Sequence, residues 1–151
     1  MLGYYGNEQE TQAIIQRHSD RKAWVHSGDM GYMSENGSLF ILGRLKRMII
    51  RYDGFKVFPT LIENALLTHS AVDSCCVVGI ADPEHRQGKL PLVHLVLKTE
   101  NCGDKVRQEL IALCQKELPE YAQPVEYKFR DCLPLTPIGK VDYRALEGLE
   151  G

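Results

Sequence analysis

The chain of 151 residues carries a formal net charge of -2, and 25% of its residues are charged. These values are those of an ordinary globular protein, and the length is enough for one domain with its own core. The nearly neutral charge excludes a general electrostatic attraction to nucleic acid or to a membrane surface.

The cysteines indicate a reducing compartment. Their number, 5, is odd, and they form no Cys-x-x-Cys pair. Cys75 and Cys76 are adjacent in an apolar run, where a strand would point them to opposite faces, so they do not share a metal. This usage favours reduced thiols in a cytoplasmic protein. The sequence also lacks a basic N-terminus followed by an apolar stretch and any run of about 18 apolar residues, so it predicts neither export nor a transmembrane segment.

From Gly3 to Arg44 the sequence predicts turns and short strands. Two turn dipeptides, Asn36-Gly37 and Asp53-Gly54, tolerate positive φ. Each separates two short apolar runs, and this arrangement predicts a β-hairpin. The four expected strands are residues 31–33, 39–42, 48–50 and 55–57.

Two helices are expected in the second part of the chain. The first begins at Pro59 and ends near His69, and its apolar side carries Ile62, Leu66 and Leu67. The second follows Asp104, which is a good N-cap, and ends before Pro119. Its apolar side carries Val106, Leu110, Ile111 and Cys114.

Three strands are expected between and after these helices, at residues 75–80, 92–97 and 125–129, with the turn-rich segment 82–88 between the first two. Two helices interleaved with three strands bury one face of a sheet. The sequence therefore predicts an α+β fold, a small two-layer domain with a three-stranded sheet packed by helices, preceded by a β-hairpin region.

A lysine stands in a proline- and glycine-containing segment near the end of the chain, residues 134–142, which we call the lysine loop. Pro137 fixes φ and removes a donor, and Gly139 admits conformations that are closed to other residues. The long stem of Lys140 then suits the delivery of one positive charge to one place. The alternative is that Lys140 is an ordinary solvated lysine.

Together with Ser27-Gly28-Asp29 and residues 43–47, the lysine loop resembles the adenylate-forming superfamily of acyl-CoA synthetases, adenylation domains of peptide synthetases and firefly luciferase. The resemblance covers nearly the whole chain, with its motifs in order and at compatible spacings. The other matching segments are Gly3-Tyr4-Tyr5, residues 24–32, Glu35-Asn36-Gly37, residues 53–59, Ile62-Glu63, Val77-Val78-Gly79, Asp82-Pro83 and residues 118–121.

The resemblance implies a domain division. Residues 1–44 are expected to be the β-rich C-terminal end of a large N-terminal domain, and residues 45–151 a mobile C-terminal lid that carries the catalytic lysine. In this family the large domain holds a Ser/Thr/Gly-rich phosphate-binding loop and the acyl pocket, and neither is among these residues. Because Met1 stands inside a family-like segment, we expect a fragment, inactive alone, whose partner is the missing N-terminal domain.

The implied activity is that of an ATP-dependent acyl-CoA synthetase, which activates a carboxylic acid, such as a fatty acid, as acyl-AMP and transfers it to CoA. ATP, CoA and Mg²⁺ are the implied cofactors, with the Mg²⁺ ligands outside this chain. One alternative is an adenylation domain that acts with a carrier protein. Another is a stand-alone binding module without chemistry.

The resemblance also implies roles for single residues. Lys140 would be catalytic and contact the nucleotide, since an ammonium stabilises the charge that builds at the α-phosphate as the carboxylate attacks. Asp29 would accept hydrogen bonds from the ribose hydroxyls, although an Asx turn also fits its setting. Arg44 would bind the ribose and phosphate side of the nucleotide. By position, the hinge between the two domains falls on Lys46.

After rotation about the hinge, residues 51–56 would meet the active site and admit the thiol. Arg51, Gly54 and Lys56 are the implied thiol-tunnel residues, although Gly54 could serve only the hairpin turn. The basic residues of this region could also form a solvated face or bind CoA phosphates or RNA. No interleaved aromatic residues accompany them, so we expect no nucleic-acid partner.

Four residues depart from the family pattern: Arg47 stands where an acidic residue is frequent, Leu61 and Lys89 where glutamate is frequent, and Tyr143 where arginine is frequent. The histidines lack the i, i+4 spacing of a helical zinc pair, and we assign none to a metal. They are His18, His26, His69, His85 and His94.

Overall fold

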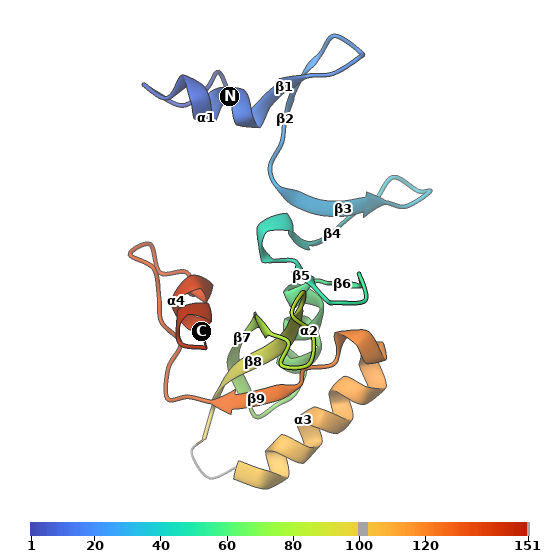
Figure 1. Cartoon of the computed structure of the whole chain (residues 1–151), viewed down its shortest axis with the longest axis vertical. Coiled ribbons are helices and arrows are strands. Elements are labelled where there is room, and N and C mark those ends of the chain that lie inside the picture. Colours follow the sequence, from blue (N-terminus) through green and yellow to red (C-terminus); the bar gives the residue numbers. More distant parts are fainter. Residues whose placement is uncertain (100–102, 151) are drawn as a thin grey trace.

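The computed structural model describes residues 1–99 and 103–150 (Figure 1). The first part of the chain contains α1 (Glu8–Ile14), β1 (Ile15–Arg17), β2 (Ala23–Val25), β3 (Asp29–Met33) and β4 (Leu39–Arg44). The second part contains η1 (Leu45–Arg47), β5 (Ile49–Ile50), β6 (Lys56–Val57), α2 (Pro59–Leu67), β7 (Val72–Ala81), β8 (Lys89–Leu97), α3 (Gly103–Glu117), η2 (Glu120–Ala122), β9 (Glu126–Phe129) and α4 (Tyr143–Gly148).

A three-stranded sheet in the order β7-β8-β9 is the centre of the second part. The strands β7 and β8 are antiparallel, and their register runs from Val72 opposite Leu97 to Ala81 opposite Lys89. The short strand β9 lies parallel to β8 on its other side. The α+β class and the three strands are confirmed, and the first two strands are longer than predicted.

The helices α2 and α3 cover one face of this sheet and were both predicted. Leu66 of α2 and Leu110 of α3 are fully buried beside strand residues such as Val77 and Leu95. Asp104 lies in the first turn of α3 instead of capping it, a position where the helix dipole also favours a carboxylate. The residue before the helix lies outside the described residues.

The short helix α4 packs on the opposite face of the sheet and was not predicted (Figure 1). Its Leu146 is fully buried in a second core, which it shares with Cys76, Val78, Leu92 and Leu133. Cys75 belongs to the first core, so the expectation that the two adjacent cysteines point to opposite faces is confirmed. Helices therefore cover both faces of the sheet, whereas the sequence predicted helices on one face only.

The first part of the chain has almost no interior. Of residues 1–44, all of which the structure describes, only Gly43 is buried. Large apolar side chains such as Trp24, Phe40 and Ile41 are each about half exposed or more. An exposed apolar surface of this kind is typical of an interaction site.

Both predicted hairpins are present: β3 pairs with β4, and β5 with β6. Gly37 and Gly54, at their turns, have φ of 85° and 83°, which glycine adopts without strain. The prediction of only turns and strands before Arg44 was wrong for α1, which Asn7 caps by accepting a hydrogen bond from the Glu10 N–H at 3.0 Å. No helix among the described residues is long and apolar enough to cross a membrane.

A buried polar cluster joins the end of the chain to the middle of the sheet. His94 on β8 is fully buried, and its Nδ1 accepts a hydrogen bond from Arg130 Nε at 2.8 Å. On its other side Nε2 lies 3.7 Å from Glu150, which also pairs with Lys128. Burial lowers the pKa of His94 to about 4, and the charge of Arg130 adds to this effect.

This cluster predicts a loss of stability on acidification. The unfolded chain takes up the His94 proton near pH 6.5 and the folded chain only near pH 4, so the free energy of unfolding should fall between these values. Taken alone, this pKa shift corresponds to a loss of roughly 3 kcal/mol in the free energy of unfolding. Urea unfolding at a series of pH values tests this, with His94→Gln as the control. The variant should show a shallower pH dependence, and an unchanged slope would contradict the assignment.

Candidate active site

Asp29 and Arg44 lie opposite each other where the β3–β4 hairpin meets the rest of the chain. Arg44 Nε is 2.9 Å from Asp29 Oδ1, and its Nη1 donates to the Ser27 carbonyl at 2.8 Å. The turn at Ser27-Gly28-Asp29 is closed by the Ser27 hydroxyl, which accepts a hydrogen bond from the Asp29 N–H at 3.2 Å, and not by the Asp29 side chain. The Asp29 and Arg44 side chains are 30% and 61% exposed, so the pair contributes little to stability and is open to a ligand.

A cleft of about 270 Å³ begins beside this pair. Its lining residues are Ser27, Gly28, Arg44, Lys46, Arg47 and Tyr143. Tyr143 is the first residue of α4 and follows the lysine loop directly. The structure thus brings the predicted Arg44 and Lys46 to one cleft with Tyr143, the residue that follows the lysine loop, whereas Lys140 itself is not among the lining residues.

The lysine loop has the hairpin conformation that its proline and glycine favour. The Thr136 carbonyl accepts the Gly139 N–H at 2.8 Å, and the Lys140 carbonyl accepts the Thr136 N–H at 2.7 Å. Gly139 has φ of 78°, so Pro137, Ile138 and Gly139 form a three-residue turn with a bulge. Lys140 is exposed, and within the described part of the chain its ammonium has no hydrogen bond or ion pair.

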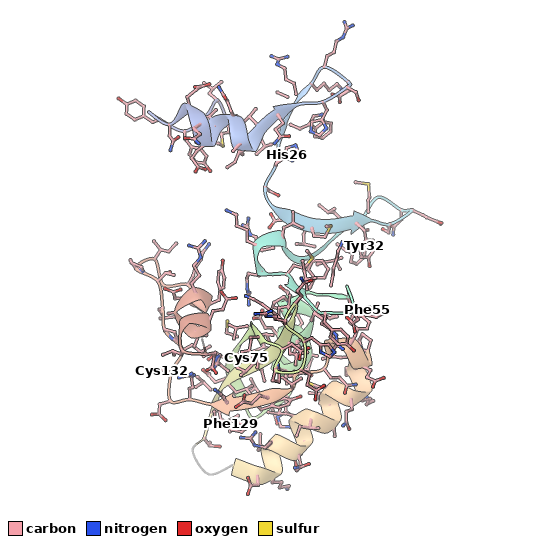
Figure 2. All side chains as sticks on the ribbon, viewed as in Figure 1. His26, Tyr32, Phe55, Cys75, Phe129 and Cys132 are labelled. Atoms are coloured by element: carbon pink, nitrogen blue, oxygen red, sulfur yellow. The ribbon has the colours of Figure 1, made fainter. Side chains whose placement is uncertain are left out.

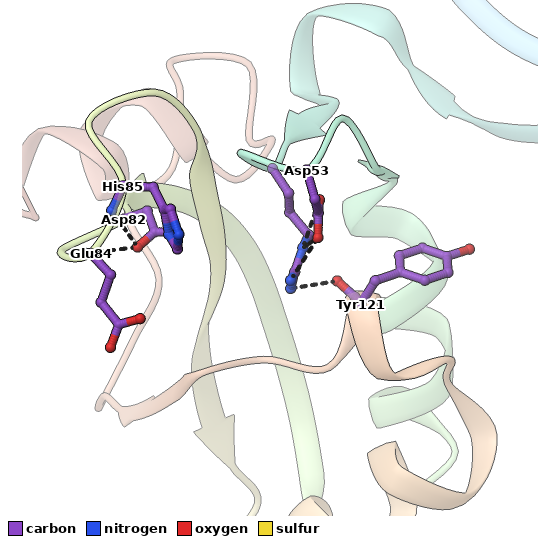
Figure 3. Close-up of polar contacts among 6 residues, drawn as sticks. Asp53, Asp82, Glu84, His85 and Tyr121 are labelled. Carbon is purple, nitrogen blue, oxygen red and sulfur yellow. Dashed lines mark hydrogen bonds and ion pairs between the residues drawn. The ribbon is translucent and has the colours of Figure 1, made fainter.

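The turn at residues 51–56 is held rigidly. Arg51 binds the Asp53 carboxylate at 3.1 Å and donates to the Tyr121 carbonyl at 3.2 Å (Figure 3). The hydrogen bond from Arg51 lowers the pKa of Asp53. Gly54 lies in this turn. A Cβ at this position would meet no atom within 4 Å, but the positive φ of the residue still favours glycine.

Two aromatic stacks lie beside Gly54. Tyr52 stacks on His85 with ring centroids 3.5 Å apart, and Phe55 stacks on Tyr121 at 4.6 Å. His85 is held in turn by Asp82 at 3.0 Å (Figure 3). These aromatic residues were not predicted for the site, because their stacking depends on contacts between loops distant in the sequence.

The lysine loop and the 51–56 turn lie on different sides of the sheet. Figure 1 shows the loop that precedes α4 on one side and the β5–β6 hairpin on the other. Phe55 projects on the side away from α4 (Figure 2). The two predicted functional segments therefore lie on opposite sides of one sheet.

Two of the four departures from the family pattern are in contact. The guanidinium carbon of Arg47 lies 5.3 Å from the centroid of the Tyr143 ring. Tyr143 was noted in the sequence only as a departure, and its position three residues after Lys140 was the one signal of a place near the site. No cluster of three or more potential metal-ligating side chains occurs within residues 1–99 and 103–150.

Comparison with known proteins gives consistent results. The family model described as the AMP-binding enzyme C-terminal domain matches residues 61–140. The chain is 36% identical over 146 residues to a long-chain-fatty-acid–CoA ligase of Bacillus subtilis, covering 97% of this chain and 24% of the relative. It is 35% identical to a 2-succinylbenzoate–CoA ligase of Bacillus mycoides, over 97% of this chain and 28% of the relative.

Solved structures with a similar fold agree with these sequence matches. The o-succinylbenzoate CoA synthetase of Bacillus subtilis, in complex with its acyl-adenylate intermediate, matches with a TM-score of 0.82 and 30% identity, over 96% of this chain and 28% of that one. An amide bond synthetase of Marinactinospora thermotolerans matches with a TM-score of 0.82 and 26% identity, over 97% of this chain and 28% of that one. The chain thus spans about a quarter of the length of these proteins.

Proposed function

Because the chain belongs to the AMP-binding enzyme C-terminal domain family, we propose that it is the lid of an ATP-dependent acyl-CoA synthetase. The observation that carries the proposal is the cleft in which Arg44 and Lys46 meet the segment that follows Lys140. We place the domain division where the sequence suggests it, with residues 1–44 belonging to a large N-terminal domain. The exposed apolar side chains of those residues support this division.

In the first half-reaction a carboxylate oxygen attacks the α-phosphorus of ATP, the bond to the β-phosphate oxygen breaks, and pyrophosphate leaves. Asp29 accepts hydrogen bonds from the ribose hydroxyls, and Arg44, displaced from Asp29, binds on the phosphate side. Lys140 brings an unpaired ammonium on a preformed turn, so it stabilises the charge of the transition state with little reorganisation.

In the second half-reaction the lid rotates about Lys46, and the 51–56 turn replaces the lysine loop. The thiol sulfur, after loss of its proton, attacks the acyl carbonyl, and AMP leaves. Gly54 allows the thiol arm to pass close to the backbone, and the Arg51–Asp53 pair keeps the turn in one shape. The exposed Lys56 supplies positive charge along this path, whereas the charge of Arg51 is compensated by Asp53.

We infer CoA as the acceptor because the relatives at 36% and 35% identity are CoA ligases. The second candidate acceptor is an amine, because an amide bond synthetase is a structural neighbour at 26% identity. The carrier protein that the sequence resemblance allows stays a further alternative. The identity of the acid is determined in the large domain. Mg²⁺ would accompany ATP, with ligands outside this chain, and the free thiols of Cys75, Cys76, Cys114 and Cys132 suit the cytoplasm.

Lys140→Ala in the full-length enzyme should lower the rate of adenylation by about 10² to 10³, because one preorganised charge is lost from the transition state. Pyrophosphate exchange measures this step. Thioester formation from supplied acyl-AMP should survive, since Lys140 then faces away. Equal loss of both half-reactions would show that Lys140 has a structural role.

Lys46→Pro should hold the lid in one orientation, since proline locks φ and removes the amide donor. We expect adenylation to be retained and CoA thioester formation to fall by at least about tenfold. Lys46→Ala is the matched control, because it removes the same side chain and leaves the backbone free. If both variants catalyse both steps equally well, the hinge is not at Lys46.

A further inference from the structure

Arg47, the residue after the proposed hinge, is fixed on the lid by several contacts. Its Nη2 donates to Glu63 Oε1 at 2.5 Å and to the Val77 carbonyl at 3.2 Å. The same Glu63 oxygen accepts the Val77 N–H at 2.9 Å. The Arg47 and Glu63 side chains are only 21% and 13% exposed. The guanidinium is therefore tied to both α2 and β7.

The position of this charge is well defined. Burial of Arg47 acts to lower its pKa, but the hydrogen bond and the charge of Glu63 outweigh burial, so the pKa lies above its ordinary value. The guanidinium carbon lies over the Tyr143 ring, 5.3 Å from the ring centroid. A cation over an aromatic ring is an attractive and directional contact.

Tyr143 connects this contact to the lysine loop. It is the first residue of α4, and Asp142 caps the helix by accepting the N–H groups of Arg144 and Ala145 at 3.1 Å. The Asp142 N–H donates to the Pro134 carbonyl at 2.8 Å, which closes the base of the loop that has Lys140 near its tip. The angle of the loop therefore depends on where Tyr143 and the buried Leu146 hold α4.

We propose that Arg47 and Tyr143 are positioning residues for Lys140. The Tyr143 ring, held by the Arg47 guanidinium, sets the direction of the lysine loop and forms one wall of the cleft that contains Arg44 and Lys46. This inference rests on the proposed function. Both residues follow the proposed hinge, so their contact survives rotation of the lid, and the loop returns to the cleft already in its working orientation.

The test is a double-mutant cycle in the full-length enzyme, with Tyr143→Leu made both with Lys140 present and with Lys140→Ala. With Lys140 present, Tyr143→Leu should lower the kcat of adenylation by about fivefold to thirtyfold, the range expected for one lost cation–π contact. The KM for ATP should stay within about twofold. In the Lys140→Ala background Tyr143→Leu should cause no further loss, because its effect acts through the lysine.

Two controls separate positioning from folding. Tyr143→Phe keeps the ring and should retain full activity, and thioester formation from supplied acyl-AMP should be unchanged in every variant. If Tyr143→Leu proves too unstable to assay, as judged by thermal melting, the unbranched Tyr143→Met replaces it in the same cycle.

The outcomes distinguish the two claims. A loss from Tyr143→Leu that is equal in both backgrounds, or no loss with Lys140 present, would overturn the positioning role and leave the proposed function standing. Adenylation that survives Lys140→Ala at the full rate would overturn both.

Discussion

The partly buried ion pair between Arg47 and Glu63 is the contact on which the arrangement of the chain depends. It joins the residue immediately after Lys46 to α2 and, through Val77, to the central sheet. Removing one partner of such a pair leaves a partly buried charge uncompensated, at a cost below the roughly 3–5 kcal/mol of a fully buried pair. Arg47 is therefore fixed to the sheet, which is consistent with the proposed hinge at Lys46, the residue before it.

The sheet behind this ion pair explains how one small domain presents two functional segments. Its central strand, β8, is covered on one face by α2 and α3 and on the other by α4. Because each face has its own core, the lysine loop beside α4 and the 51–56 turn are both attached to the same sheet. In the proposed mechanism a rotation at Lys46 exchanges one for the other without repacking either core.

Much of this fold could be predicted because local signals and burial agree. The turn dipeptides Asn36-Gly37 and Asp53-Gly54 determined both hairpins, and Pro59 with Ile62 and Leu66 determined α2. The helix α4 could not be found in this way, because six residues give too short a periodic pattern, and its place depends on the single buried Leu146.

The candidate site also contains some residues that sequence motifs point to and others that only the tertiary structure places. Asp29, Arg44 and Lys140 were proposed from the sequence because they stand in family motifs, and their roles stay predictions. Tyr143 and His85 were not assigned to the site, because their places depend on contacts with Arg47 and Tyr52 that are remote in the sequence. Contacts of this kind follow from the tertiary structure and have no local pattern.

We propose that the chain changes at Lys46 from a segment without a core of its own to a self-supporting lid. Hydrogen–deuterium exchange on the isolated chain, resolved by residue, tests this proposal, since protection reports the local free energy of opening. We expect strong protection of amides in β7, β8 and α3, and rapid exchange of amides in β1 to β4, where almost no side chain is buried. Protection of β3 and β4 equal to that of β7 and β8 would contradict it.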